Sequence, residues 1–249
     1  MPELPNFRQN ANDFEDWLMP GWKISRRQAL VALGLTAFPK ISVATPLVDL
    51  ALVLAIDCSF SVNEEAYHLQ MQGLGKAFND AEIHKLILKG FHRRIAIAAF
   101  HWSNPDTQRI VLPWRILEGA NDAMKAGQVL MNALREIEAG VTATGSALLY
   151  ALKLFEGAPS GTRQVVDIST DGSSNSGSSA PAARDAITSS GITINALAIL
   201  DEEPHLTTYL ERDVIGGDGA FIETADDFSA FGAAIRKKLM REISNLAIS

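Results

Sequence analysis

Residues 47–61 read Leu47-Val48-Asp49-Leu50-Ala51-Leu52-Val53-Leu54-Ala55-Ile56-Asp57-Cys58-Ser59-Phe60-Ser61. The almost unbroken apolar run predicts a strand that is buried on both faces, as in a parallel sheet. It ends abruptly in Asp-x-Ser-x-Ser, so the strand delivers oxygen-bearing side chains into the loop at its carboxyl end. A carboxylate and two hydroxyls at alternating positions suit a hard cation such as Mg²⁺, which takes oxygen ligands. A local role is the alternative, because Asp57, Ser59 or Ser61 could cap the helix expected from Val62.

Apolar runs of strand character recur along the chain and alternate with segments of helical spacing. Further strands are predicted at residues 94–100, 108–117, 162–172, 192–200 and 219–224. Helices are predicted at residues 62–79, 121–138, 181–190 and 205–213, in a segment that follows the hydroxyl-rich turn at Thr142 and runs through Phe155, and after a cap at Asp226 or Asp227. Pro113 cannot donate to a ladder, which places its strand at an edge. We therefore expect an α/β fold: a doubly wound, mostly parallel six-stranded sheet with one antiparallel edge strand and helices on both faces.

The apolar faces of two of these helices can be assigned from the sequence. Asn121 or Asp122 is expected to cap a helix that buries Met124, Met131, Leu134 and Ile137. The last helix carries an apolar stripe made of Phe228, Phe231, Ile235, Leu239, Ile243 and Leu246.

Two further oxygen-rich segments flank predicted elements. Thr142-Ala143-Thr144-Gly145 leads into a helix, and Ser169-Thr170-Asp171-Gly172 ends a strand. In an open doubly wound sheet, ligands bind outside the carboxyl ends of the strands. Three separated segments that bring only oxygen side chains to that edge are harder to explain as helix caps than as a cation site. The predicted ligands are Asp57, Ser59, Ser61, Thr142 and Asp171.

Taken in this order, the three segments resemble the metal-ion-dependent adhesion site (MIDAS) of von Willebrand factor A domains. The resemblance covers the chain from about Leu47 to Leu246. Within that superfamily the chain is similar to an exported bacterial group described only as a domain of unknown function. The residues that carry this similarity are Val48-Asp49-Leu50-Ala51-Leu52-Val53, Val111-Leu112-Pro113-Trp114 and Gly191-Ile192-Thr193-Ile194-Asn195.

The resemblance implies a ligand set and a partner. Ser59, Ser61 and Thr142 would touch Mg²⁺ or Mn²⁺ directly, and the two aspartates would act directly or through water. The open coordination position would take a Glu or Asp carboxylate from a protein partner. Thr144 is a second hydroxyl near the site, and the choice of Thr142 rests on its spacing from Gly145. Phe60 occupies a variable position of the first loop, where it would narrow the rim or give a partner an apolar contact.

The N-terminal residues resemble an export signal. Ser25-Arg26-Arg27-Gln28-Ala29-Leu30 is followed by a short apolar core and by Ser42-Val43-Ala44, the order of a bacterial twin-arginine signal. Residues 1–44 are therefore expected to be a signal peptide, and cleavage after Ala44 would leave a von Willebrand factor A-like domain, residues 45–249, in the periplasm. The alternative is an amphipathic helix packed on the domain of a cytoplasmic protein.

Composition excludes several classes of partner. The chain has 249 residues, 47% of them hydrophobic, and a formal net charge of -7 without a cluster of Lys or Arg. Nucleic acid and anionic membrane surfaces are therefore not expected as partners, and no apolar run is long enough to span a bilayer. The lone Cys58 permits no internal disulfide.

These observations favour a cation-dependent protein-binding module, and not an enzyme. A magnesium-dependent phosphoryl-transfer enzyme is the first alternative, since Asp57 ends a strand where aspartyl-phosphate enzymes keep their nucleophile. Such enzymes usually need a second acid two residues on, where this chain has Ser59. A metal-free scaffold that binds through its loops is the second alternative. Serine hydrolysis and dinucleotide binding lack their sequence signatures.

Overall fold

The structure is a computed structural model that describes residues 46–244. The predicted signal peptide with its cleavage point after Ala44, and the final stripe residue Leu246, lie outside the described residues.

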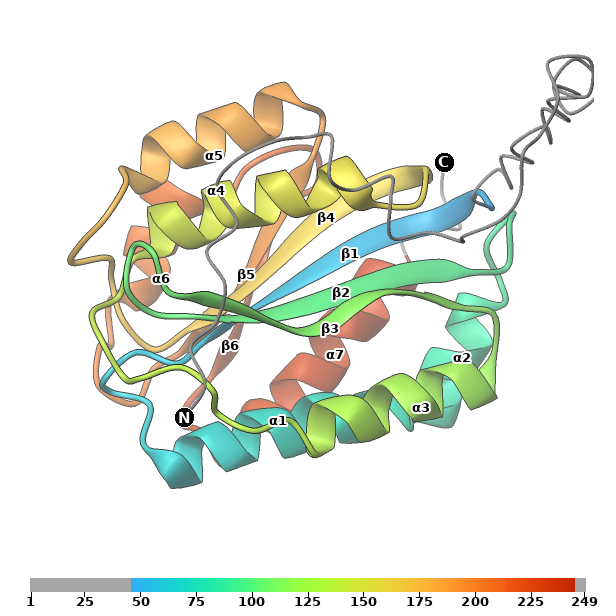
Figure 1. Cartoon of the computed structure of the whole chain (residues 1–249), viewed down its shortest axis with the longest axis horizontal. Coiled ribbons are helices and arrows are strands. Elements are labelled where there is room, and N and C mark those ends of the chain that lie inside the picture. Colours follow the sequence, from blue (N-terminus) through green and yellow to red (C-terminus); the bar gives the residue numbers. More distant parts are fainter. Residues whose placement is uncertain (1–45, 245–249) are drawn as a thin grey trace, which may run out of the picture. The chain divides into compact units, whose positions relative to one another are not determined.

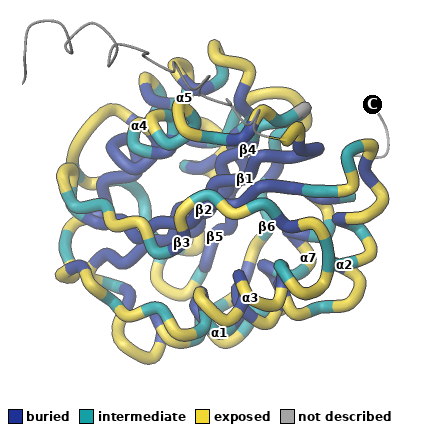
Figure 2. The backbone as a smooth tube through the Cα atoms, turned by 45° about the vertical axis from the view of Figure 1, so that its right-hand side comes forward, coloured by how far each residue is buried: buried dark blue, intermediate teal, exposed yellow. Residues whose placement is uncertain are grey.

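One six-stranded sheet forms the centre of the domain, with β1 (Val48–Asp57) in its interior (Figure 1). The spatial order is β3-β2-β1-β4-β5-β6, and every neighbouring pair is parallel except β2 with β3. Every residue of β1 is buried, as its apolar run predicts, and Figure 2 shows the strands as the buried centre. The predicted fold class is confirmed. The other strands are β2 (Ile95–Trp102), β3 (Gln108–Leu117), β4 (Gly161–Thr170), β5 (Thr193–Ile199) and β6 (Ile222–Ala225).

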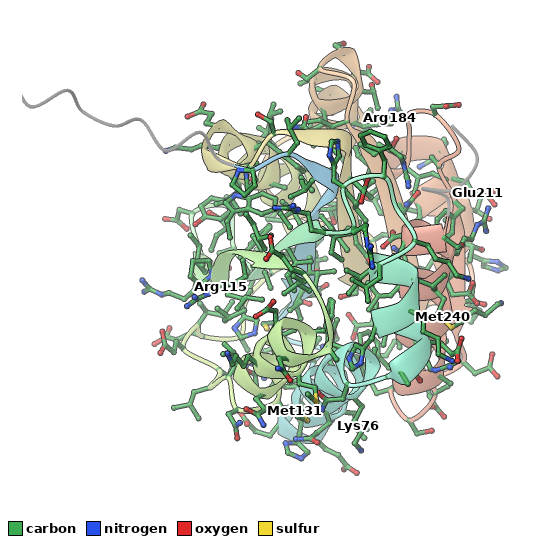
Figure 3. All side chains as sticks on the ribbon, turned by 90° about the vertical axis from the view of Figure 1, so that its right-hand side faces the viewer. Lys76, Arg115, Met131, Arg184, Glu211 and Met240 are labelled. Atoms are coloured by element: carbon green, nitrogen blue, oxygen red, sulfur yellow. The ribbon has the colours of Figure 1, made fainter. Side chains whose placement is uncertain are left out.

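Helices cover both faces of the sheet. One face carries α1 (Glu64–Phe78), α2 (Ala81–Ile87), α3 (Ala120–Met131) and α7 (Phe231–Ser244). The other face carries α4 (Thr144–Leu154) with the 3₁₀ turn Phe155–Gly157, α5 (Ala180–Ser189), and α6 (Leu206–Tyr209), which continues into the π-type turn Leu210–Val214. Figure 3 shows the two layers edge-on, with Arg184 of α5 on one side of the sheet and Lys76 of α1 and Met131 of α3 on the other.

The edge strand β3 confirms the prediction made from Pro113. Among the strands of residues 46–244 it pairs with β2 alone, and the register shifts between Ile97 and Ala99, opposite the segment that holds Pro113. Proline has no N–H to donate to the neighbouring strand, so the hydrogen bonding between β2 and β3 is interrupted by a bulge or similar irregularity at this point.

The helix predicted over residues 121–138 is shorter than expected and begins differently. Its first residue is Ala120 and its last is Met131. The N-cap is Gly119, which has no side chain to cap with, so neither Asn121 nor Asp122 is the cap. Its buried face is made of small residues and one leucine: Ala123, Ala126, Gly127 and Leu130. Of the four residues expected inside, Ile137 is buried, whereas Met124 is 38% and Leu134 is 75% exposed. The small residues allow a close approach, since a Cβ on Gly127 would lie 2.6 Å from the carbonyl oxygen of Gly75 in α1.

The last helix is closer to its prediction. Asp227 caps the turn that leads into α7, where it accepts hydrogen bonds from the backbone N–H of Ala230 (2.9 Å) and from the hydroxyl of Ser229 (2.6 Å), and the helix itself begins later, at Phe231. The predicted apolar stripe is buried at every described position.

Candidate metal centre

The predicted ligands gather where the strand order reverses. From β1 the chain moves to β2 on one side, whereas β4 returns on the other side of β1. Asp57 is the last residue of β1, and Asp171 directly follows β4, so the two carboxylates leave adjacent parallel strands at the same edge. This edge, toward the left in Figure 1, is where the loops that follow β1, α3 and β4 lie. Such a switch point leaves a crevice for a ligand.

The loop after β1 does not use its oxygen side chains to cap α1. The N-cap of α1 is Asn63, whose side-chain oxygen accepts a hydrogen bond from the N–H of Ala66 at 2.9 Å. The capping alternative is therefore wrong for Asp57, Ser59 and Ser61. Asp57 instead accepts a hydrogen bond from the Ser59 N–H at 2.7 Å and one from the Thr170 hydroxyl at 2.5 Å.

Asp171 faces the two serine hydroxyls. The hydroxyl of Ser61 donates to Oδ1 of Asp171 at 2.8 Å, and the hydroxyls of Ser59 and Ser61 are 3.3 Å apart. The other carboxylate oxygen of Asp171 is buried without a hydrogen-bond partner, although the residue is only 1% exposed. A buried carboxylate oxygen left unpaired carries a large desolvation cost, which indicates a missing ligand.

The structure distinguishes the two threonines. Thr142 lines the hollow beside Asp171, and its Oγ1 lies 4.0 Å from the position of a Cβ added to Gly172. Thr144 is fully buried as the first residue of α4, and its hydroxyl lies beside the phenol of Tyr209. Burial raises the pKa of Tyr209, and its contacts with Thr144 and Ser174 offset part of that rise. Neither threonine caps α4, because its N-cap is Ala143 without a side-chain hydrogen bond.

Gly145 explains why the second segment ends in glycine. A Cβ at this position would lie 2.1 Å from the carbonyl oxygen of Ser178. The first turn of α4 therefore packs directly on the serine-rich loop that follows β4. That loop also holds the backbone of Thr142, which donates to Oδ1 of Asn175 at 3.0 Å and accepts from the Asn175 N–H at 2.9 Å.

A hollow of about 740 Å³ opens above Asp171. Ser61, Thr142 and Asp171 all line it, and Phe60, which is 83% exposed, stands at its rim as the sequence predicted. The remaining lining residues are Asn104, Ala139, Gly140, Val141, Gly172, Ser173, Asn175, Glu202 and Glu203.

Arg135 fixes the loop after β1 from behind. Its guanidinium donates to the carbonyl oxygens of Val62 at 2.6 Å, Cys58 at 2.9 Å and Ser59 at 3.3 Å. The side chain is only 11% exposed. Three carbonyls held by one planar cation set the course of the loop and leave its side-chain hydroxyls free to face Asp171.

Burial governs the electrostatics of the two carboxyls. Asp57 is fully buried, and burial, followed by the negative charge of Asp171, raises its pKa from 3.8 to about 7. Burial also raises the pKa of Asp171, although the hydrogen bond from Ser61 opposes that rise. Two carboxyls whose charge is so poorly compensated favour a positive charge between them.

The side chains present fit a divalent cation held by oxygen. Within residues 46–244 no group of three or more His, Cys, Asp or Glu side chains gathers that could hold a metal. The cluster here instead combines two carboxylates with hydroxyls, the donors preferred by hard cations such as Mg²⁺ and Mn²⁺ over Zn²⁺ or Cu²⁺. The unpaired oxygen of Asp171 is the donor that a cation would satisfy.

Several residues around the site were missed from the sequence. Glu202 and Glu203 lie in the loop that follows β5, so the rule that placed Asp171 at a strand end would also have pointed to this loop. Arg135 gave no such signal, because it was assigned to a helix that ends before it.

A comparison with protein families and curated proteins places the chain by sequence. The profile of a family described as "Protein of unknown function (DUF1194)" matches residues 47–247. The curated proteins gave no significant match.

Solved structures share the fold at low sequence identity. Proximal thread matrix protein 1 from the mussel byssus superposes with a TM-score of 0.55 and 18% identity, over 80% of this chain and 48% of that one. The pilus adhesin SpaC of Lactobacillus rhamnosus GG gives 0.60 and 15%, over 80% and 31%. The von Willebrand factor domain of the pilus tip protein Mfa5 from Porphyromonas gingivalis gives 0.58 and 10%, over 81% and 97%.

The similarity to these structures concerns the domain and not the whole proteins. The chain spans about half the length of the mussel protein and about a third of the adhesin. One structure of the mussel protein is described as having a zinc-occupied MIDAS motif. The fold is that of a von Willebrand factor A domain, as the sequence resemblance implied.

Proposed function

The chain belongs to the family of proteins of unknown function DUF1194, and we propose that it is a protein-binding module. The module binds its partner through a divalent cation. The observation that carries this proposal is the buried, unpaired oxygen of Asp171 beside two serine hydroxyls and a second buried carboxyl.

The proposed cation is Mg²⁺ or Mn²⁺. Ser59, Ser61 and Thr142 would hold it with Asp171, while Asp57, whose two oxygens already accept hydrogen bonds, would act from behind through the serine loop or through water. A cation held largely by neutral hydroxyls retains affinity for an anion, so it supplies one coordination position for a carboxylate. The hollow above Asp171 gives a Glu or Asp side chain of a partner protein access to that position.

The geometry disfavours phosphoryl transfer. A nucleophilic aspartate must present a free oxygen to the substrate, but Asp57 is fully buried and both of its oxygens accept hydrogen bonds. A metal-free scaffold would leave the unpaired oxygen of Asp171 without a purpose. The fold of mussel matrix and pilus proteins is consistent with binding, and we propose that this chain is not an enzyme.

Two threonine variants test the proposed ligand set. We expect Thr142→Val to weaken Mn²⁺ binding by roughly tenfold or more, since a directly coordinating hydroxyl is lost. Thr144→Val is the matched control, because its hydroxyl lies beside Tyr209, and its Mn²⁺ affinity should stay within about twofold of the parent. Calorimetric titration of the full chain with MnCl₂ measures both. Weaker binding by Thr144→Val with normal binding by Thr142→Val would contradict the assignment, and no heat for the parent would reject the cation site.

Arg135→Lys tests the support behind the serine loop. A lysine keeps the charge but cannot donate to three carbonyls in one plane, so the loop should lose its fixed course. We expect Mn²⁺ affinity to fall by roughly tenfold, as for other residues that position metal ligands. Arg109→Lys is the control, because the Arg109 side chain is 60% exposed and forms only a long ion pair with Glu136, at 4.0 Å. Equal Mn²⁺ affinity of the two variants would show that the hydrogen bonds of Arg135 do not position the metal ligands.

We also propose that the module works in the periplasm, on the basis of the twin-arginine pattern in residues 1–44. Within residues 46–244, no helix has the length and apolarity needed to cross a bilayer.

A further inference from the structure

The hollow above Asp171 has two unlike walls. Apolar atoms form one wall, where Phe60 is 83% and Val141 is 40% exposed. Acidic side chains form the other wall, where Glu202 and Glu203 line the hollow. Asp201 precedes them in the same loop after β5 and is exposed.

The carboxylates of the acidic wall differ in whether they accept hydrogen bonds. The two carboxylate oxygens of Glu203 accept hydrogen bonds from the N–H (2.7 Å) and the hydroxyl (2.6 Å) of Ser173. The carboxylates of Asp201 and Glu202 are exposed and have no hydrogen-bond or ion-pair partner within residues 46–244. Glu203 therefore builds the wall, and the other two leave negative charge available at its surface.

These free charges act on the proposed metal centre. Glu202 and Glu203 line the same hollow as Asp171, so their negative charges lie on the surface toward which the cation position opens. Asp171, which holds the buried oxygen without a partner, is itself one of the residues that line this hollow. The acidic wall and the cation position are therefore parts of one binding surface.

A lone carboxylate would be a poor ligand for such a surface. Its approach to the metal brings it toward Glu202 and Asp201, and like charges brought together oppose binding. The net charge of -7 adds a long-range repulsion. A ligand that places a positive charge on the acidic side relieves the local repulsion and gains an attraction.

We propose that this module recognises an Asp or Glu of a partner protein that has a Lys or Arg side chain next to it. The carboxylate takes the metal position, the basic group lies against Glu202 and Asp201, and apolar groups of the same segment contact Phe60 and Val141. The inference rests on the proposed function and adds the charge of the partner's flanking residue. The partner surface is thus basic around the acidic residue that it inserts.

Three synthetic peptides of equal length separate the parts of this proposal. The first contains Leu, Glu and Arg in a glycine background, the second has citrulline in place of Arg, and the third has Gln in place of Glu. Citrulline keeps the size and hydrogen bonding of Arg but lacks its charge. Their affinities for the full chain are measured by fluorescence anisotropy in Mn²⁺ and in EDTA, after thermal unfolding has shown that Mn²⁺ is bound.

We expect the Arg peptide to bind roughly fivefold to tenfold more tightly than the citrulline peptide, as two partly exposed ion pairs allow. In the double variant Asp201→Asn with Glu202→Gln, this preference should fall below about twofold, while the citrulline peptide should bind at least as tightly as before. A second double variant, Glu211→Gln with Asp218→Asn, removes two exposed carboxylates elsewhere and should retain the preference; Figure 3 labels Glu211.

The failures of the two proposals differ. If Mn²⁺ gives no stabilisation, or if the Gln peptide binds as well as the Glu peptide, the proposed function fails. If Mn²⁺ is bound but the Arg peptide shows no binding up to millimolar concentration, or binds no better than the citrulline peptide, the inference about the flanking charge fails. It also fails if the Arg preference survives in the Asp201 and Glu202 double variant.

Discussion

Asp57→Asn should abolish the stabilisation by Mn²⁺ and yet make the metal-free protein more stable at pH 8. Burial and the charge of Asp171 raise the pKa of Asp57 from 3.8 to about 7, so the ionised carboxyl opposes folding when no cation is present. Below about pH 4 the carboxyl is protonated in both states and gives no penalty. As the pH rises toward 7, the unfolded chain releases this proton first, and the free energy of unfolding falls. Above pH 7 the full penalty is about 4 kcal/mol, from 1.36 kcal/mol per pKa unit.

Asparagine can occupy this position without leaving its neighbours unpaired. Its amide oxygen can accept the hydrogen bond from the Ser59 N–H that Asp57 now accepts. The Thr170 hydroxyl, which now donates to Asp57, lies 3.0 Å from the carbonyl oxygen of Gly172 and can donate there instead. The substitution therefore removes a charge and keeps the packing, and both neighbouring donors still have an acceptor.

Urea unfolding at pH 5 and pH 8, in EDTA and in Mn²⁺, measures both effects. At 100 times its dissociation constant, Mn²⁺ should stabilise the parent by about 2.7 kcal/mol and the variant by almost nothing. The gain in metal-free stability should be large at pH 8 and small at pH 5. A variant that is less stable than the parent at pH 8 in EDTA, or that keeps the Mn²⁺ effect, would contradict this account.

Asp49→Asn is the matched control. Asp49 is a buried aspartate of the same strand, and its two carboxylate oxygens accept hydrogen bonds from the backbone N–H groups of His92 (2.8 Å) and Arg94 (3.3 Å). An amide has only one oxygen, so this variant should lose stability and keep the response to Mn²⁺. Opposite outcomes for two buried aspartates of β1 would separate a binding role from a structural one.

The sequence predicted the sheet because burial on both faces leaves a plain signal. The almost unbroken apolar run of β1 and the Val-Val-x-Ile of β4 both end in oxygen-rich segments, and neighbouring parallel strands then bring Asp57 and Asp171 to one edge. The two predicted aspartates therefore needed only strand positions and the rule for strand ends. Thr142 follows no strand, so the rule does not place it; its position depended on its spacing from Gly145, where α4 packs on the serine-rich loop.

What the sequence did not predict depends on contacts between segments far apart. Residues 121–138 have helical spacing throughout, but the helix ends at Met131, after which Arg135 reaches back to three carbonyls of the β1–α1 loop. Those bonds outweigh a weak local preference for helix. The pairing of Glu203 with Ser173 likewise joins two loops about thirty residues apart, and no local pattern announces it.

Lys238→Met is expected to be the most destabilising substitution away from the site. Lys238 is fully buried on α7, and its ammonium lies 2.5 Å from Oδ1 of Asp167 on β4 and 2.8 Å from Oε1 of Glu242. Asn195 of β5 donates to the same Glu242 oxygen at 2.9 Å, so the cluster fastens α7 to the sheet. Removal of this ammonium takes the buried counter-charge from Asp167 and leaves Glu242 with only the partly buried guanidinium of Arg163 nearby, which costs about 3–5 kcal/mol.

The loss should depend on pH in a defined direction. Burial and the charge of Glu242 already raise the pKa of Asp167 to about 7, against the opposing effect of Lys238. Without Lys238 the carboxyls hold their protons to higher pH, so the variant should be closest to the parent near pH 5 and fall further behind toward pH 8. Lys237→Met is the control, because the Lys237 side chain is 74% exposed and pairs with Glu223. The free energy of unfolding of this variant should stay within about 0.5 kcal/mol of the parent. Urea unfolding of both variants in EDTA decides the matter: equal midpoints, or a loss that shrinks as the pH rises, would show that the buried cluster does not hold α7 in place.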